Sequence, residues 1–238
     1  MDFRHKSSIE EIRKRFDKDV ERFSNLDTGQ LTVPDAALMM ELCTDAAKYA
    51  NPGARELLDI GCGAGNYTLK MLSKIPNLNC TLNDLSQPML DKAGERLADQ
   101  TKGTLTLIQE DMRLLELRDN QFDIVFAAAV LHHLREDGEW EGFFRKIYRA
   151  LKPGGSFWIS DLLEHDVPAI NRLFVHRYSA YLEGLGGPSH RDKVWKYIRE
   201  EDSPRSLSFQ VDLLRKVGFS AVEVLHKNGL FAAFGAVR

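Results

Sequence analysis

The spacing of hydrophobic positions along the chain changes near residue 56. Before it, apolar side chains recur at spacings of three and four, at Ile9, Ile12, Phe16, Val20 and Phe23. This spacing predicts an amphipathic helix over residues 9–23. A second helix is expected from residue 34 to about residue 49, because Pro52 and Gly53 stop a helix beyond that point. We therefore expect residues 1–52 to form an N-terminal helical lid.

From residue 56 onward, short apolar runs alternate with helical stretches. The runs cover residues 56–61, 79–84, 105–111, 122–130, 156–162, 221–226 and 230–237. Apolar runs joined by helices predict parallel strands covered on both faces. The turn signal "KNG" between the last two runs predicts a hairpin, so the last strand should run antiparallel to its neighbour. The predicted fold class is α/β, with a doubly wound, mostly parallel seven-stranded sheet.

The connection between the runs at 156–162 and 221–226 is longer than one crossover helix requires. It is rich in aromatic and charged residues and is interrupted by Gly184, Gly186, Gly187 and Pro188. These residues predict two helices with a flexible joint. We therefore expect one domain over residues 53–238 that carries an inserted helical cap at about residues 165–206.

Composition narrows the function classes. The formal net charge of −3 and the pI near 6.2 give no broad positive field for a phosphate backbone, so nucleic acid is disfavoured as a partner. The three cysteines lack metal-ligand spacing and are too few for a disulfide framework. With neither a signal peptide nor an apolar membrane span in the sequence, we expect a cytoplasmic protein that does not bind membranes. The oligomeric state stays open, with a homodimer as one alternative.

The stretch "LLDIGCGAGN" at residues 57–66 places a glycine-rich turn directly after the first predicted strand. Such a turn lies at the carboxyl edge of the sheet and offers free backbone N–H groups to a ligand. The glycines are Gly61, Gly63 and Gly65, whereas a dinucleotide fingerprint would place its last glycine at Asn66. This departure disfavours an NAD-dependent oxidoreductase.

A second anchor for a ligand is Asp84, which ends the second predicted strand. It follows Gly61 by close to the ~20 residues expected of an acid that binds a ribose. The alternative is a helix cap for the segment that follows, a position for which Ser86 competes.

Five segments in order resemble the motifs of class I S-adenosylmethionine-dependent methyltransferases. They are "LLDIGCGAGN", "LNDLSQPML", "EDM" at 110–112, "FDIVFAAAVLHHL" and "LKPGGSFWISDL". The resemblance spans residues 56 to about 161. It implies a Rossmann-like fold, S-adenosyl-L-methionine as the cofactor, and transfer of its methyl group to an acceptor by in-line displacement.

The resemblance also implies which residues contact the cofactor. Asp59 and Gly61 would contact the amino group of its methionine part, and Gly63 would allow a close approach. Asp84, together with Leu85, would bind the ribose. Asp111 would accept from the adenine amine while Met112 covers a ring face, with loop packing as the alternative for Met112. Ala128 would lie near the sulfonium.

The pair His132 and His133 suggests a base or a metal site. Adjacent helical residues point about 100° apart, so the two rings cannot readily bind one ion and we predict no metal. His132 is a candidate catalytic base, with a packing histidine as the alternative. Other candidates at strand ends or in the cap are Asp161, His165, His176, Arg177 and Tyr178.

The acceptor is not identified by these motifs. The segment after the fourth strand lacks a "DPPY"-like or "NPPY"-like sequence, which argues against methylation of a nucleobase amine. We expect a small-molecule acceptor beneath the aromatic, basic cap.

Two alternatives to methyl transfer remain. "RFDKDVERF" and the carboxyl-terminal segment resemble the carboxy-S-adenosylmethionine synthase branch, in which Arg191 or Arg199 would pair with the cofactor's carboxylate. The other alternative is a non-catalytic S-adenosylmethionine-binding subunit that uses its N-terminal helices as an interface.

Overall fold

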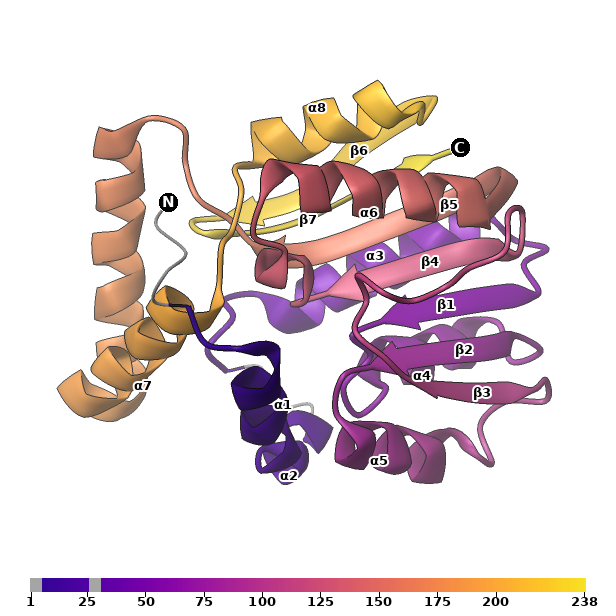
Figure 1. The fold of residues 1–238 in the computed structure, drawn as a ribbon, viewed down its shortest axis with the longest axis horizontal. Helices are drawn as coiled ribbons and strands as arrows, with labels where there is room; N and C mark the ends of the chain where they lie inside the picture. The colour runs from indigo at the N-terminus through magenta and orange to yellow at the C-terminus, as the bar shows by residue number, and fades with distance from the viewer. Residues whose placement is uncertain (1–5, 26–30) are drawn as a thin grey trace.

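The computed structural model describes residues 6–25 and 31–238, and its centre is one seven-stranded sheet (Figure 1). The strands are β1 (Glu56–Ile60), β2 (Asn79–Asp84), β3 (Leu105–Gln109), β4 (Phe122–Ala128), β5 (Leu151–Leu162), β6 (Ala221–Asn228) and β7 (Phe231–Val237). Their order is β3-β2-β1-β4-β5-β7-β6. The first five are parallel and β7 is antiparallel to both of its neighbours. The predicted doubly wound, mostly parallel sheet is confirmed.

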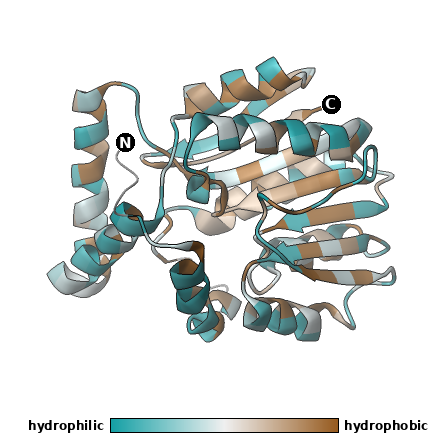
Figure 2. Ribbon diagram, in the orientation of Figure 1, coloured by the Kyte–Doolittle hydropathy of each residue, from teal (hydrophilic) through white to brown (hydrophobic). Residues whose placement is uncertain are grey.

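Five of the described helices cover the two faces of this sheet. The helices are α1 (Ile9–Asp17), α2 (Val20–Ser24), α3 (Ala36–Ala50), α4 (Asn66–Lys74), α5 (Gln87–Leu97), the 3-10 turn η2 (Leu131–His133), α6 (Asp137–Ala150), α7 (Pro168–Glu201) and α8 (Leu207–Val217). On one face, α3, α4 and α5 pack over a core that includes Leu57 and Met71. On the other face, α6 and α8 pack over a second core that includes Leu58 and Trp140. Brown apolar stretches follow the central strands in Figure 2, as two-sided burial requires.

The N-terminal helix differs from its prediction. One helix was expected over residues 9–23, but α1 ends at Asp17 and α2 begins at Val20. The chain turns at Lys18, whose N–H donates to the carbonyls of Arg15 and Phe16. This break brings the rings of Phe16 and Phe23 to 5.7 Å between centroids, so both apolar residues of the predicted stripe stay on the side facing the sheet.

The predicted cap is the helix α7, which projects from the carboxyl ends of the strands (Figure 1). Its helical backbone is interrupted at Gly186 and Gly187, where Gly187 has φ of 77°. The joint predicted from the glycines is therefore present. Figure 1 places α1 between α7 and the edge of the sheet at which β1, β2 and β4 end.

Among the described residues, no helix is both long and apolar enough to cross a membrane. The cysteines Cys43, Cys62 and Cys80 are free and buried. The division into a lid at 1–52 and a domain at 53–238 stays a prediction, and within the lid region α3 packs against β5 and β7.

Candidate active site

A cavity of about 500 Å³ lies at the carboxyl ends of the parallel strands, beneath α1, α2 and the cap. Its volume falls within the range of small-molecule sites. The eight cofactor positions predicted from the sequence and the candidate base His132 lie in its wall. These residues are Asp59, Gly61, Gly63, Asp84, Leu85, Asp111, Met112, Ala128 and His132.

The glycine-rich turn forms the floor of the cavity between β1 and α4. Gly61 and Gly63 have φ of 60° and 51°, values that side-chain-bearing residues rarely adopt. A Cβ on Gly61 would lie 2.4 Å from a methyl carbon of Val130, whereas a Cβ on Gly63 would have no neighbour within 4 Å. The backbone at Gly63 is therefore open to the cavity, where a ligand can approach it closely.

Asp84 fixes this turn to the end of β2. One carboxylate oxygen accepts a 2.8 Å hydrogen bond from the Gly63 N–H, and the other accepts a 2.9 Å bond from the Ser86 N–H. The N-cap of α5 is Ser86, whose hydroxyl accepts from the Met89 N–H. Asp84 is thus not the capping residue, and its carboxylate keeps further acceptor capacity toward the cavity. Burial raises the pKa of Asp84 to about 6.

Asp59 lies deeper in the wall, at the end of β1. Its carboxylate accepts a 2.7 Å hydrogen bond from the Thr68 hydroxyl. Burial raises the pKa of Asp59 to about 7, although the hydrogen bonds from Thr68 act in the opposite direction. This carboxylate therefore binds α4 to β1 as well as facing the cavity.

Asp111 and Met112 follow β3 and form the adjoining wall. Arg113 donates to both oxygens of Asp111, at 2.8 and 2.7 Å. Burial alone would raise the pKa of Asp111, but the hydrogen bonds and charge of Arg113 outweigh it and hold the pKa below its usual value. An amine that bound Asp111 would share its oxygens with Arg113. Met112 is buried and also contacts the core on the α6 face.

At the other end of the cavity, His132 forms a buried pair with Asp161 of β5. The His132 Nδ1 atom hydrogen-bonds one oxygen of Asp161. The other oxygen accepts from the backbone N–H groups of Leu131 and His132, at 2.8 and 3.2 Å. Burial opposes protonation of His132, but the charges of Asp161 and Asp202 outweigh it and raise the pKa to about 9. The two carboxylates thus favour positive charge at this ring.

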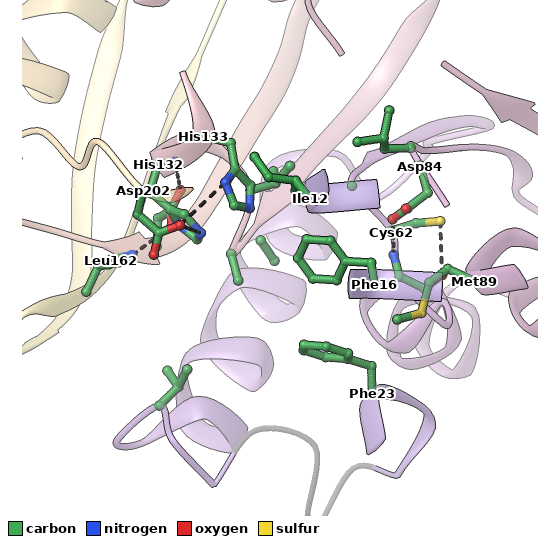
Figure 3. Close-up of a pocket in the computed structure, with 18 of the residues that line it drawn as sticks. Ile12, Phe16, Phe23, Cys62, Asp84, Met89, His132, His133, Leu162 and Asp202 are labelled. Carbon is green, nitrogen blue, oxygen red and sulfur yellow. Dashed lines mark hydrogen bonds and ion pairs between the residues drawn. The ribbon is translucent and has the colours of Figure 1, made fainter. Parts of the chain in front are cut away.

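His133 and Asp202 complete this cluster. The ring centroids of His132 and His133 lie only 4.5 Å apart, so the expectation that the rings diverge is wrong. Both belong to the tight 3-10 turn η2, and Asp202, directly after α7, reaches between them. Figure 3 shows His133 and Asp202 pointing toward each other, with Asp84 on the opposite side of the cavity. Asp202 was not singled out from the sequence, since only the fold brings it to the histidines.

The remaining wall is apolar and aromatic and comes from α1, α2 and α7. Its members include Ile9, Ile12, Phe16, Phe23, Tyr178, Val194, Tyr197 and Ile198. The described lining residues with basic side chains are Arg15, Arg22, Arg113, Lys193 and three histidines. Arg15 binds α1 to the end of α7, because its Nε lies 2.7 Å from an oxygen of the buried Glu201.

Several sequence candidates lie elsewhere. Tyr178 and Asp161 line the cavity, but His165, His176 and Arg177 are not among its described lining residues. Neither are the two arginines predicted for an anionic group. Arg191 instead pairs with Glu183 and Asp192 on the surface of the cap.

Comparison with known proteins gives concordant similarities. A family model described as "Methyltransferase domain" matches residues 57–155. Demethylmenaquinone methyltransferase of Lactococcus lactis is 26% identical over 187 residues, which cover 76% of this chain and 73% of that protein. Carboxy-S-adenosyl-L-methionine synthase of Trichodesmium erythraeum is 29% identical over 194 residues, which cover 80% of this chain and 75% of that protein.

Among solved structures, the DhpI-SAM-HEP complex is similar with a TM-score of 0.63 and 18% identity. The similarity covers 97% of both chains. At this identity the similarity shows the fold.

Proposed function

We propose that the chain is a class I S-adenosylmethionine-dependent methyltransferase and that the described cavity holds the cofactor and a small-molecule acceptor side by side, which the similarities to methyltransferases support. The observation that carries the proposal is that the eight predicted cofactor positions and the candidate base His132 all line this one cavity. A family fold alone would not locate the site, since function depends on the particular residues.

The residues at the glycine turn fit the cofactor. Asp84 offers carboxylate oxygens to the ribose hydroxyls, and the open backbone at Gly63 leaves space for a close approach. Asp59 and Gly61 are proposed to face the amino group, Leu85 to join Asp84 at the ribose, Asp111 and Met112 to flank the adenine, and Ala128 to lie near the sulfonium. The N-terminus of α4 provides free N–H groups for the carboxylate.

The acceptor is proposed to occupy the opposite end, beside His132 and His133. The apolar side chains of the lid and cap exclude water there, which favours a nucleophile with little solvation. When bound, S-adenosylmethionine supplies a methyl group that its sulfonium already activates. The chain therefore has to position the acceptor in line and let it lose a proton. No covalent intermediate with the protein is required.

We further propose that residues 1–52 act as a lid. Ile12, Phe16 and Phe23 of α1 and α2 lie over the cavity (Figure 3). The Arg15 to Glu201 pair supports this role, because it fastens α1 to the cap without using the core of the sheet.

A second candidate is synthesis of a carboxylated sulfonium, as in the synthase that the Trichodesmium relative is named for. Such a product needs a cation beside its carboxylate. The proposed cation is Lys193, which lines the cavity, whereas the arginines predicted from the sequence do not.

A cytoplasmic location is part of the proposal, supported by the three free, buried cysteines. The net charge of −3 supports a small molecule rather than nucleic acid as the acceptor.

The proposal is tested by incubating the protein with S-adenosylmethionine that carries a labelled methyl group and with sets of phenols, thiols and amines. We expect S-adenosylhomocysteine to form and one acceptor class to gain one labelled methyl group for each molecule of it. A carboxylated sulfonium released by denaturing the protein as purified would instead support the second candidate. Failure to bind either S-adenosylmethionine or S-adenosylhomocysteine would refute both.

A further inference from the structure

We propose that His132, His133 and Asp202 form a divalent-metal site that opens into the cavity. The ion also binds an ionisable hydroxyl group of the acceptor, a role that rests on the proposed function. The three residues come from η2 and from the residue that follows α7, segments far apart in the sequence.

The distances within the cluster suit one small ion. The ligand atoms of the three residues all lie within 4.8 Å of one another. His133 Nδ1 is 3.4 Å from the Asp202 carboxylate, and His132 Nε2 is 3.7 Å from the same oxygen. Ligands of a tetrahedral ion at bonds of about 2.0–2.1 Å are separated by about 3.3 Å. Small side-chain movements would therefore complete the site.

Asp161 supplies the outer partner that metal-binding histidines usually have. It hydrogen-bonds the Nδ1 of His132, which turns the Nε2 of that ring toward Asp202. Backbone N–H groups of Leu131, His132 and Leu162 in turn hold the Asp161 carboxylate. A carboxylate behind a ligating imidazole fixes the ring and raises its basicity as a ligand.

His133 gives an independent indication. Both of its ring nitrogens are buried, and neither makes a hydrogen bond within the usual geometric limits with a described residue. Among the polar groups that act on the ring are the Asp202 carboxylate, 3.4 Å from Nδ1, and the backbone of Glu201. A buried polar group without a well-formed hydrogen bond costs about 1–3 kcal/mol. An ion bound between Nδ1 and Asp202 would satisfy both groups.

The local charges are compatible with a divalent ion. Asp161 and Asp202 together carry two negative charges when ionised, enough to balance it. The nearby Arg15 is already paired with Glu201. Lys6 donates to the backbone carbonyl of Asp202 rather than to its carboxylate. Arg113, which also acts on His133, is paired with Asp111.

Three protein ligands leave at least one coordination position open, as in catalytic rather than structural sites. All three residues line the cavity, so this position can face the acceptor. Two imidazoles and a carboxylate suit Zn²⁺, Fe²⁺ or Co²⁺ better than Mg²⁺. A hydroxyl bound to the ion loses its proton to solvent more readily. Its oxygen then forms a bond to the methyl carbon as the carbon–sulfur bond breaks, giving a methyl ether and S-adenosylhomocysteine.

The test uses the full chain without a histidine tag, treated with EDTA and titrated with Co²⁺. Visible absorption reports ligation of Co²⁺, and Zn²⁺ should displace it. We expect binding at one ion per chain, weakened at least 10-fold by His133→Ala or Asp202→Asn. Asp161→Asn should weaken it by about 10- to 100-fold through the outer partner. The matched control is His226→Ala, which removes a surface histidine 2.9 Å from Asp35 and should leave Co²⁺ binding unchanged.

Circular dichroism and calorimetry with S-adenosylhomocysteine on the same samples show which variants are folded. Absence of saturable Co²⁺ binding by the wild-type protein would overturn the metal site whatever the variants do, and so would equal binding by the folded His133→Ala protein. Normal S-adenosylhomocysteine binding in that case would leave the proposed function standing. If the ion binds the hydroxyl group of the acceptor, EDTA should abolish methyl transfer to hydroxyl acceptors and added metal should restore it. Transfer that EDTA does not affect would refute this role of the ion.

Discussion

Replacing Asp84 by alanine should weaken cofactor binding while the chain stays folded. The carboxylate lies in the cavity wall with one backbone donor on each oxygen, which leaves acceptor capacity for ribose hydroxyls. Alanine removes that capacity and also releases the Gly63 N–H, which loosens the glycine-rich turn.

The size of the effect follows from the bonds lost. A hydrogen bond to a charged group contributes about 1.5–3 kcal/mol, which corresponds to a loss of affinity of about 10- to 150-fold. Asp84→Asn retains one acceptor oxygen of similar shape, so it should show a smaller loss. Isothermal titration calorimetry with S-adenosylhomocysteine measures both without any need for the acceptor.

Asp123 provides a matched control at the opposite edge of the sheet. Its carboxylate also accepts from two backbone N–H groups, those of Arg55 and Glu56, both at 2.9 Å. It is not among the described lining residues of the cavity. Asp123→Ala should therefore lower the melting temperature but leave S-adenosylhomocysteine affinity unchanged. A folded Asp84→Ala protein with wild-type affinity would refute the assignment of Asp84 to the ribose.

Three further predictions concern the same cavity. Gly63→Val should abolish S-adenosylhomocysteine binding in calorimetry, because its φ of 51° disfavours a side chain and the new methyl groups would enter the cavity; unchanged binding would show that this turn does not hold the ligand. Since burial raises the pKa of Asp84 to about 6 and the ribose contact uses the ionised carboxylate, affinity should be level above about pH 7 and fall by up to about tenfold per unit below pH 6. The Asp84→Ala protein should not lose affinity in this way at low pH. Equal pH profiles for the two proteins would show that protonation of Asp84 is not the cause of the loss. Arg15→Ala leaves the buried Glu201 without its partner, so the free energy of unfolding should fall by about 1–3 kcal/mol, with a lower melting temperature. Protease should also cut α1 faster. Unchanged cleavage would argue against a lid held by this pair.

The strands and the glycine turn could be predicted because their signals are local. Apolar runs and helical spacing lie within short windows of sequence, and parallel strands bring their carboxyl ends to one edge by topology alone. That is why Gly63, Asp84 and Met112 lie around one cavity as expected. The break between α1 and α2 was missed, since the apolar stripe continues through Lys18 without interruption.

The contacts of the cap could not be predicted, because they join segments distant in the sequence. Asp202 meets His132 and His133 only after α7 has turned back toward η2. The rings were expected to diverge at a helical angle, but their centroids lie 4.5 Å apart. Rotation of the side chains brings them together, since successive residues of a 3-10 turn point about 120° apart. Likewise, Arg15 gives no local sign that its partner is Glu201.

The central claim is that this cavity binds S-adenosylmethionine, and native mass spectrometry of the purified protein tests it most directly. Denaturing release should yield S-adenosylmethionine or S-adenosylhomocysteine at no more than one molecule per chain, and protein isolated empty should take up either on titration. A chain that carries neither compound and binds neither on titration would contradict the account.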